Sequence, residues 1–358
     1  MAGVNEGRRG EDGSIASGAA ALAAARSAVG ITFHDAGLEE AILAILADVE
    51  GDLREAVTAA DPVLGDAARH LVDAGGKRFR PLLVALAAQF GDPGRPLVRR
   101  AAVVVELTHL ATLYHDDVMD EAPVRRSAQS ANARWGNAIA ILTGDYLFAR
   151  AADIAADLGT EAVRIQARTF ARLVHGQIAE TVGPREGDPV RHYLRVITDK
   201  TGSLIGTSAR FGAMFSAAPS STVEAMALYG DTIGVAFQLS DDVLDIASES
   251  RESGKTPGTD LREHVPTMPV LLLRQHVASD EATDDDRDLL AILDGDLSSD
   301  EALDAALERL RAHDVLAQTR ELAVQWARAA SAELAPLPEG PVKESLEKFA
   351  QVLADRAV

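Results

Sequence analysis

LTHLATLYHDDVMDEAPVRR, residues 107–126, ends a run of apolar residues at helical spacing in three aspartates, Asp116, Asp117 and Asp120. On a helix of 3.6 residues per turn, Asp116 and Asp120 lie one above the other, and His109 lies on nearly the same face. Carboxylates this close together repel one another unless a cation lies between them. The helix end is therefore either a solvated acidic cap or one wall of a metal site.

The same spacing occurs again in FQLSDDVLDI, residues 237–246, where Asp241, Asp242 and Asp245 follow another apolar run. Gln238 shares a helix face with Asp242 and Asp245. Mg²⁺ prefers oxygen ligands and usually binds through one or two carboxylates plus substrate phosphates. Two helix walls with this spacing could hold Mg²⁺ around a diphosphate. The repetition therefore favours a metal–diphosphate site over two solvated helix ends.

The composition narrows the class of protein. Apolar residues make up 47% of the 358 residues, which is enough for a large buried core, yet no apolar run approaches the ~18 residues that a membrane span needs. The net charge of −20 argues against a nucleic-acid binder, which needs a basic surface. The chain has no cysteine, which excludes disulfides, zinc–thiolate sites and thiol nucleophiles. We expect a cytoplasmic protein without a transmembrane segment or a nucleic-acid partner.

Helical periodicity dominates the chain, and convincing strand patterns are missing. Helices are expected over several long segments, among them residues 33–60, 97–120, 137–158, 190–217 and 222–246. The pattern predicts a single all-α domain of roughly ten or more helices over residues 31–358. Residues 1–30 form a disordered or weakly helical N-terminal extension in this interpretation, and the acidic residues 279–300 form a surface excursion.

Basic residues occur where a diphosphate site needs them. Lys77 and Arg80 lie at a helix start, where backbone N–H groups also favour an anion. Arg125 and Arg126 closely follow the first aspartates. Each of these residues alone is compatible with ordinary surface charge, as are Lys200 and Lys255. Only their combination with the two acidic motifs points to a diphosphate site.

These motifs together resemble the trans-type isoprenyl diphosphate synthases, the polyprenyl synthetase family, and most of all its bacterial long-chain members. The resemblance rests on six motifs: GGKRFRP at 75–81, HDDVMD at 115–120 followed by RR, GDYL at 144–147, KTG at 200–202, FQLSDDVLD at 237–245 and GKTPGTDL at 254–261. It implies an all-α isoprenoid-synthase-type bundle around a central cavity, and a homodimer. It also implies the successive head-to-tail addition of isopentenyl diphosphate to an allylic diphosphate.

The resemblance also implies roles for individual residues. Isopentenyl diphosphate would be bound by Lys77, Arg80, His109 and Arg126, and the allylic diphosphate by Arg125, Lys200, Thr201, Gln238 and Lys255. About three Mg²⁺ ions would be bound by Asp116, Asp117, Asp120, Asp241, Asp242 and Asp245. The residues implied in the chemical step itself are Asp116, Asp117, Lys200, Thr201, Gln238 and Asp241. The family has glycine where this chain has Ser127, which bears on the turn after the arginine pair.

Product length is expected to depend on Ala111 and Thr112, just upstream of the first aspartates. Small residues there resemble the long-chain members, with all-trans products of roughly six to ten isoprene units. A quinone side chain is the expected destination, and the product could associate transiently with membranes. Alternatively, Ala111 only packs against a neighbouring helix.

Three other functions stay open at this point. The nearest is a farnesyl or geranylgeranyl diphosphate synthase of the same fold. A terpene cyclase also uses an Asp-rich helix and Mg²⁺, but its second motif normally mixes Asn, Ser or Thr with Glu, and it has no use for the basic cluster around Lys77 and Arg80. A non-catalytic subunit of a two-component synthase tends to lack one aspartate motif, whereas this chain has both.

Overall fold

The computed structural model describes residue 23 and residues 33–59, 61–126, 128–248 and 257–357. Apart from residue 23, the N-terminal extension expected over residues 1–30 lies outside them, as do Ser127 and Lys255. The chain forms two compact units. Unit 1 comprises residues 1–171, 204–230 and 333–349, and unit 2 comprises residues 172–203, 231–332 and 350–358. The single domain expected from the sequence stays a prediction.

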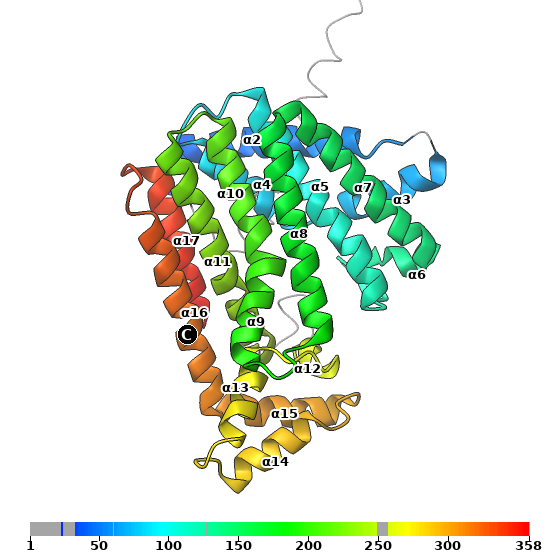
Figure 1. Cartoon of the computed structure of the whole chain (residues 1–358), viewed down its shortest axis with the longest axis vertical. Coiled ribbons are helices and arrows are strands. Elements are labelled where there is room, and N and C mark those ends of the chain that lie inside the picture. The colour runs from blue at the N-terminus through cyan, green and yellow to red at the C-terminus, as the bar shows by residue number, and fades with distance from the viewer. Residues whose placement is uncertain (1–22, 24–32, 60, 127, 249–256, 358) are drawn as a thin grey trace, which may run out of the picture. The chain divides into compact units, whose positions relative to one another are not determined.

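Unit 1 is built mainly from the N-terminal helices. Its elements are α2 (Ala36–Ala56), α3 (Pro62–Asp73), α4 (Phe79–Ala88), α5 (Pro96–Met119), β1 (Val124–Arg125), β2 (Ala128–Gln129), α6 (Ala131–Trp135) and α7 (Asn137–Leu158). Five further helices have residues in both units: α8 (Thr160–Val182), α10 (Ser203–Phe215), α11 (Ser220–Ala247), α16 (Asp314–Glu333) and α17 (Pro341–Ala357). Within unit 1, α5 and α7 lie side by side (Figure 1).

Helix α5 is the central element of unit 1. Pro96 occupies its first turn, where the missing N–H costs nothing. The helix packs against α2, α4 and α7, which explains why its middle is apolar on nearly every side. The fully buried Tyr114 ties it to α3, because its hydroxyl donates to the Ala67 carbonyl and accepts from the Leu71 N–H at 3.3 Å. These contacts fix the end of α5, where the first aspartates lie.

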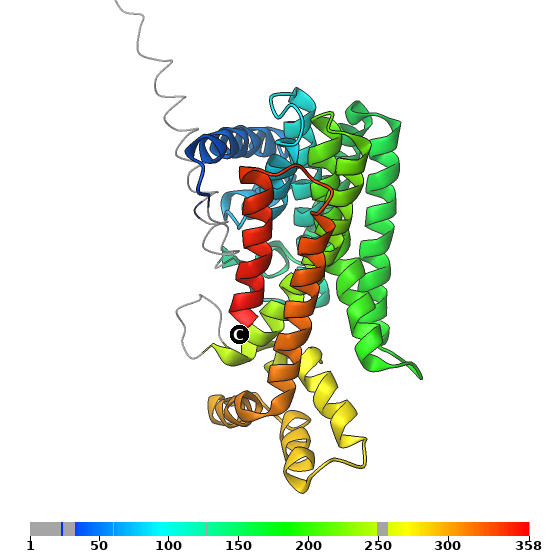
Figure 2. The ribbon, with the colours of Figure 1, turned by 90° about the vertical axis from the view of Figure 1, so that its left-hand side faces the viewer.

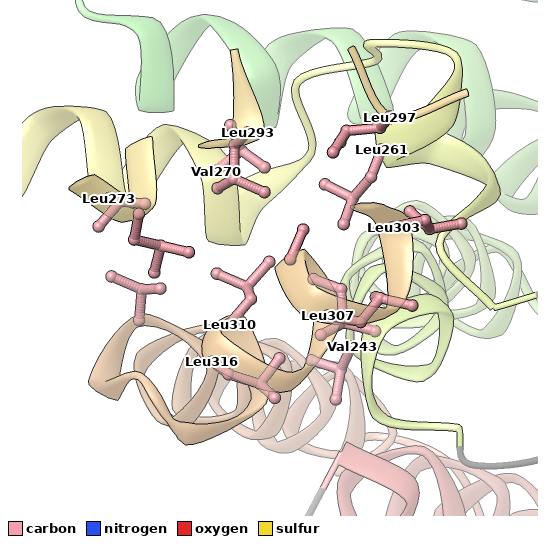
Figure 3. Packing of buried hydrophobic residues seen from close by; sticks show 14 residues of the cluster. Val243, Leu261, Val270, Leu273, Leu293, Leu297, Leu303, Leu307, Leu310 and Leu316 are labelled. Carbon is pink, nitrogen blue, oxygen red and sulfur yellow. The ribbon is translucent and has the colours of Figure 1, made fainter. Parts of the chain in front are cut away.

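Unit 2 contains the remaining helices, which are α9 (Pro189–Ile197), η1 (Thr198–Gly202, a π-helical turn), α12 (Thr259–Arg262), α13 (Met268–Val277), α14 (Asp284–Leu293) and α15 (Asp300–Ala312). The yellow and orange helices α13, α14 and α15 pack together in two views (Figures 1 and 2). Their leucines and valines form a core with Val243 of α11 (Figure 3). This core holds the C-terminal end of α11, which carries the second acidic motif.

Most of residues 279–300 are exposed, as expected for a surface excursion, but the segment also contributes to the core of unit 2. This segment contains α14, whose start is capped reciprocally by Thr283 and Asp286. Leu289, Leu293 and Leu297 are buried in the core of unit 2. Leucines three to four residues apart place one apolar stripe on a helix even when many of the surrounding residues are acidic.

The expected all-α architecture is confirmed. Among the described residues, the strands β1 and β2 are the exception, with two residues each in an antiparallel pair. The helix expected over residues 190–217 is interrupted by the π-helical turn η1, which coincides with the KTG motif. No helix in the described part of the chain is long and apolar enough to cross a membrane.

Candidate active site

The first acidic motif occupies the C-terminal end of α5 in unit 1. Asp117 is completely buried, whereas Asp116 is half-buried and Asp120 is exposed. The Arg125 Nε donates to Asp117 Oδ1 at 2.5 Å, and Arg125 Nη2 lies 3.9 Å from Asp120 Oδ2. The other buried oxygen, Asp117 Oδ2, has no hydrogen-bond partner among the described residues. An oxygen of this kind fits a site that is completed by a cation.

Arg126 is held by backbone carbonyls. Its Nη1 donates to Leu71 O at 2.8 Å and also to Gly75 O. Gly76, with φ of 147°, lies directly under its guanidinium: a Cβ on Gly76 would come within 2.7 Å of Arg126 Cζ. The second glycine of GGKRFRP is therefore required by a close approach and by its backbone conformation.

The three basic residues that lead into α4 differ in their position and exposure. Lys77 is exposed, and Arg80 lies in the first turn of α4. Arg78 caps the helix start in a left-handed conformation with φ of 44° and is almost fully buried. Lys77 and Arg80 were expected to bind substrate, but no motif indicated a role for Arg78.

Arg78 forms a buried ion-pair network with two glutamates. Its Nη1 donates to Glu106 Oε1 at 2.9 Å, its Nε to Glu50 Oε1, and its Nη2 to Val72 O at 2.9 Å. Glu106 could have been noticed in the sequence, because it is the single charge in the run AAVVVEL at 101–107. A carboxylate within such a run must find a cationic partner once the helix is buried.

Burial and mutual repulsion perturb this basic cluster. Burial lowers the pKa of Arg80 to about 10, with Arg126 contributing in the same direction and Glu106 opposing it. Burial also lowers the pKa of Arg126. The pKa of His109 lies well below its ordinary value because of burial and the surrounding Arg80, Arg126, Arg78 and Arg125 guanidiniums. His109 is therefore neutral at physiological pH and can still donate one N–H. The cluster combines Arg80, His109 and Arg126, which the sequence assigned to one substrate.

The GDYL motif supports the first acidic motif. Gly144 in α7 leaves room for the ring of His115, the residue before Asp116: a Cβ on Gly144 would lie 2.3 Å from His115 Nε2. Asp145 Oδ1 is 3.4 Å from the same nitrogen. The motif therefore allows α7 to pack closely against α5 next to the aspartates.

The two residues expected to limit product length lie in the middle of α5. Ala111 is fully buried, and its carbonyl oxygen would be 3.2 Å from a Cβ on Gly144. Thr112 is half-buried, and its hydroxyl donates to His109 O at 2.7 Å. Their role in product length stays a prediction.

In unit 2, the KTG motif coincides with the π-helical turn η1. Such turns often occur at functional sites because they reorient the side chains around them. The backbone N of Lys200 would be 2.7 Å from a Cβ on Gly176, so α8 passes close to this turn. Lys200 Nζ donates to Glu180 Oε2. The wider turn thus presents Lys200 and Thr201 together.

A chain of hydrogen bonds links Thr201 to the second acidic motif. Thr201 Oγ1 is 3.4 Å from Gln238 Oε1, and Gln238 Nε2 donates to Asp242 Oδ1 at 3.3 Å. Asp242 Oδ2 accepts from the Tyr193 hydroxyl at 2.6 Å and from Met268 N–H at 3.3 Å. Burial raises the pKa of Asp242 to about 7, against these hydrogen bonds. Tyr193 is a partner that the motifs did not indicate.

The other two aspartates of the second motif are half-buried. Asp245 Oδ2 accepts from the Asp260 N–H at 3.3 Å, and Asp245 O accepts from the Gly258 N–H at 2.8 Å. These bonds anchor residues 258–260 of the GKTPGTDL motif to α11. Among the residues that the structure describes, no three His, Asp or Glu side chains form a group that could hold a metal ion by themselves. That is compatible with Mg²⁺, which usually takes only one or two carboxylates and completes its shell with substrate phosphates and water.

Comparison with known proteins agrees with this chemistry. The model of the polyprenyl synthetase family matches residues 61–310. The chain belongs to the polyprenyl synthetase family. It is 47% identical to a nonaprenyl diphosphate synthase of Mycobacterium tuberculosis, over 91% of this chain and 97% of the relative.

Solved structures of polyprenyl synthetases share the fold. A geranylgeranyl pyrophosphate synthase from Corynebacterium glutamicum, complexed with calcium and isoprenyl diphosphate, has a TM-score of 0.81 at 43% identity, over 91% of this chain and 99% of that one. A decaprenyl diphosphate synthase from Rhodobacter capsulatus has a TM-score of 0.78 at 35% identity, over 90% and 98%. The chain is therefore a prenyltransferase, and the prediction of a long-chain polyprenyl diphosphate synthase is confirmed.

Proposed function

We propose that this polyprenyl synthetase adds isopentenyl diphosphate head-to-tail to an allylic diphosphate in a Mg²⁺-dependent reaction. Its all-trans product has roughly six to ten isoprene units. The observation that carries the proposal is the cluster of Arg80, Arg126 and neutral His109, all half-buried, an anion site a short distance along α5 from the first aspartates. The nonaprenyl relative supports the product range.

Isopentenyl diphosphate is bound by Lys77, Arg80, His109 and Arg126 in this proposal. Arg80 Nε is buried and has no hydrogen-bond partner in the described part of the chain, so a ligand oxygen there would satisfy it. Arg126 is held in one orientation by the Leu71 and Gly75 carbonyls. A guanidinium held in this way suits a diphosphate better than a flexible surface lysine would, because little side-chain entropy is lost on binding.

The allylic diphosphate is bound by Arg125, Lys200, Thr201, Gln238 and Lys255 in this proposal. The positive charges of Arg125, Lys200 and Lys255 stabilise the diphosphate as its bond to the allylic carbon breaks. The double bond of isopentenyl diphosphate then attacks the allylic cation, and a proton is lost to the departed diphosphate, so the protein needs no base of its own. Water must be excluded because it would capture the cation.

The six aspartates of the two motifs are proposed to hold about three Mg²⁺ ions, namely Asp116, Asp117, Asp120, Asp241, Asp242 and Asp245. When bound, Mg²⁺ neutralises the charge that develops on the leaving diphosphate. The calcium in the Corynebacterium glutamicum relative supports a divalent cation. Both oxygens of Asp242 accept hydrogen bonds from the chain. Its Oδ1 accepts only one of them and keeps a lone pair with which it could bind a metal.

The direct test uses purified protein, labelled isopentenyl diphosphate, farnesyl diphosphate and Mg²⁺, with the dephosphorylated products separated by size. We expect products of roughly thirty to fifty carbons, since each isoprene unit adds five. Asp116→Ala should abolish turnover, whereas Asp157→Asn, at an exposed aspartate paired with Arg100, should not. Products of fifteen or twenty carbons alone would instead establish the shorter-chain alternative. Absence of turnover by the purified chain would contradict the proposal and favour a non-catalytic subunit.

We also propose that the protein is a homodimer. Ile141 and Leu142 on α7 are 43% and 58% exposed, and neighbouring apolar side chains of this size on one helix suit a subunit interface. Light scattering after size-exclusion chromatography should give twice the mass of one chain. A monomer would contradict this part of the proposal, but not the activity. The proposed product, a precursor of a quinone side chain, is apolar enough to associate transiently with membranes.

A further inference from the structure

A buried carboxylate lies among the guanidiniums of the proposed isopentenyl diphosphate site. Glu106, in the middle of α5, is only 1% exposed. Its Oε1 accepts from Arg78 at 2.9 Å and lies 3.9 Å from Arg126 Nη2. Burying a carboxylate is costly unless cations surround it, so Glu106 and these guanidiniums stabilise one another.

Glu50 and Glu106, the two carboxylates of this cluster, interact with different sets of cations. Glu50 accepts two hydrogen bonds from Arg78 and lies 3.7 Å from the half-exposed Arg54. Glu106 also binds Arg78, but in addition its negative charge raises the pKa of both Arg80 and Arg126. Glu50 therefore belongs to the scaffold around Arg78, whereas Glu106 also faces the cations that are proposed to hold substrate.

The cluster is short of negative charge when no ligand is bound. Three guanidiniums (Arg78, Arg80 and Arg126) share two carboxylates (Glu50 and Glu106), which leaves an excess of one positive charge. Burial is the main reason why the pKa of Arg80 is lowered, and repulsion by the nearby Arg126 guanidinium lowers it further. A diphosphate would supply the missing negative charge to the same two guanidiniums.

We propose that Glu106 is an internal counter-anion that holds the substrate guanidiniums together when the isopentenyl diphosphate site is empty. This inference rests on the proposed function of that site. Glu106 and the diphosphate compete for the same cations, so Glu106 stabilises the empty protein more than the complex. By thermodynamic linkage, its negative charge must then weaken diphosphate binding.

Weaker binding of the diphosphate at the isopentenyl diphosphate site helps the protein to carry out successive additions. In each addition, the diphosphate that came with isopentenyl diphosphate stays on the elongated chain, while the allylic diphosphate departs. The elongated chain must then leave the first site before it can act as the allylic substrate of the next addition. A carboxylate that competes for Arg80 and Arg126 favours this transfer.

The test compares Glu106→Gln with Glu50→Gln, since both remove a buried charge from Arg78 but only the first removes one that faces Arg80 and Arg126. Binding of inorganic diphosphate is measured by titration calorimetry in EDTA, so that metal-dependent binding does not contribute. We expect Glu106→Gln to bind about tenfold more tightly than the wild type, the effect of one charge several ångströms away at an intermediate effective dielectric constant. Glu50→Gln should stay within about twofold of the wild type, because its charge faces Arg78, which is not among the residues proposed to bind substrate.

Two further measurements separate competition from a purely structural role. Both variants should melt at a lower temperature than the wild type, but only Glu106→Gln should regain more stability on adding diphosphate than the wild type does. In steady state, KM for isopentenyl diphosphate should fall in Glu106→Gln while KM for the allylic substrate stays the same. Glu106→Asp keeps the charge, and its diphosphate affinity should resemble that of the wild type.

Equal losses of diphosphate affinity in both variants would overturn the inference, since Glu106 would then only support Arg78. A raised KM for isopentenyl diphosphate in Glu106→Gln would overturn it as well. If Glu106→Gln does not fold alone, diphosphate should restore its folding, and failure to do so counts against the inference. These results are independent of the proposed activity, which fails separately if the wild-type protein has no turnover.

Discussion

The contact between Gly144 and His115 allows a sharp test of how α7 positions the first acidic motif. A Cβ at residue 144 would lie 2.3 Å from His115 Nε2 and 2.5 Å from Cδ2, distances at which one of the groups must move. The His115 ring cannot turn away without loss, because its Nε2 also lies 3.2 Å from Ile141 O and 3.4 Å from Asp145 Oδ1. Gly144→Ala therefore displaces either the ring or the end of α5.

The magnitude follows from two opposing effects. Overpacking of this kind typically costs about 1–3 kcal/mol, whereas Ala in place of Gly within a helix gains about 0.5–1 kcal/mol. We expect Gly144→Ala to lose about 1–2 kcal/mol of unfolding free energy. Gly51→Ala is the matched control, because Gly51 lies exposed in α2 and a Cβ there would meet nothing within 4 Å. This control should gain about 0.5–1 kcal/mol.

The assay is urea denaturation of both variants, together with turnover, which should fall only in Gly144→Ala because His115 directly precedes Asp116. When Gly144→Ala is combined with His115→Ala, the methyl group added at residue 144 no longer meets an imidazole ring. Most of the loss caused by Gly144→Ala should then disappear, with a coupling of about 1 kcal/mol. The reasoning is refuted if Gly144→Ala is as stable as Gly51→Ala, or if its loss is unchanged when His115 is already Ala.

Three further predictions concern product length, substrate binding and pH. Ala111→Phe should shorten the product, as seen by mass spectrometry of dephosphorylated products, if this buried residue limits the growing chain; unchanged length would show that it only packs against α7. Gly76→Ala should raise KM for isopentenyl diphosphate several-fold and lower the melting temperature, because φ of 147° is unfavourable for Ala and its Cβ would meet the Arg126 guanidinium; kinetics like those of the wild type would contradict this close contact. Hydrogen bonds from the Thr283 N–H and hydroxyl and from His313 hold the pKa of Asp286 below its ordinary value of 3.8, so the stability it contributes is present above that pH and is lost as pH falls further. Asp286→Asn should remove that part of the acid sensitivity in urea denaturation below about pH 4, where the wild-type carboxylate becomes protonated, and an unchanged pH dependence in that range would disprove the assignment.

The helical fold and the family were accessible from the sequence because they depend on local patterns. Apolar spacing of three to four residues identifies a helix wherever it lies, and the paired aspartate motifs combine spacing with residue type in a way that few functions require. The surface prediction for residues 279–300 holds for most of their side chains, but it missed the leucine spacing that places part of the segment in the core. Leu289 and Leu293 are buried there despite the charge around them.

The hydrogen bonds and ion pairs that hold the candidate site residues in place could not be predicted from the sequence, because they join residues far apart in the chain. Arg78 finds Glu50 and Glu106, each 28 residues away, and Tyr193 finds Asp242 across 49 residues. No local pattern relates such partners, since they meet only when helices pack. The roles of individual substrate and metal residues therefore remain predictions that rest on the motifs.

The sequence by itself determined that residues 107–126 end a helix in a metal-type motif, and that a second motif of the same kind follows. The tertiary structure decided which of these side chains are presented and which are buried. Asp117 is buried against Arg125, and Asp242 is buried among Tyr193, Met268 and Gln238. Arg78, which lies between Lys77 and Arg80 in the sequence, is buried against Glu50 and Glu106. The physical reason is that burial and charge compensation depend on which helices pack together, whereas helical periodicity is fixed within each helix.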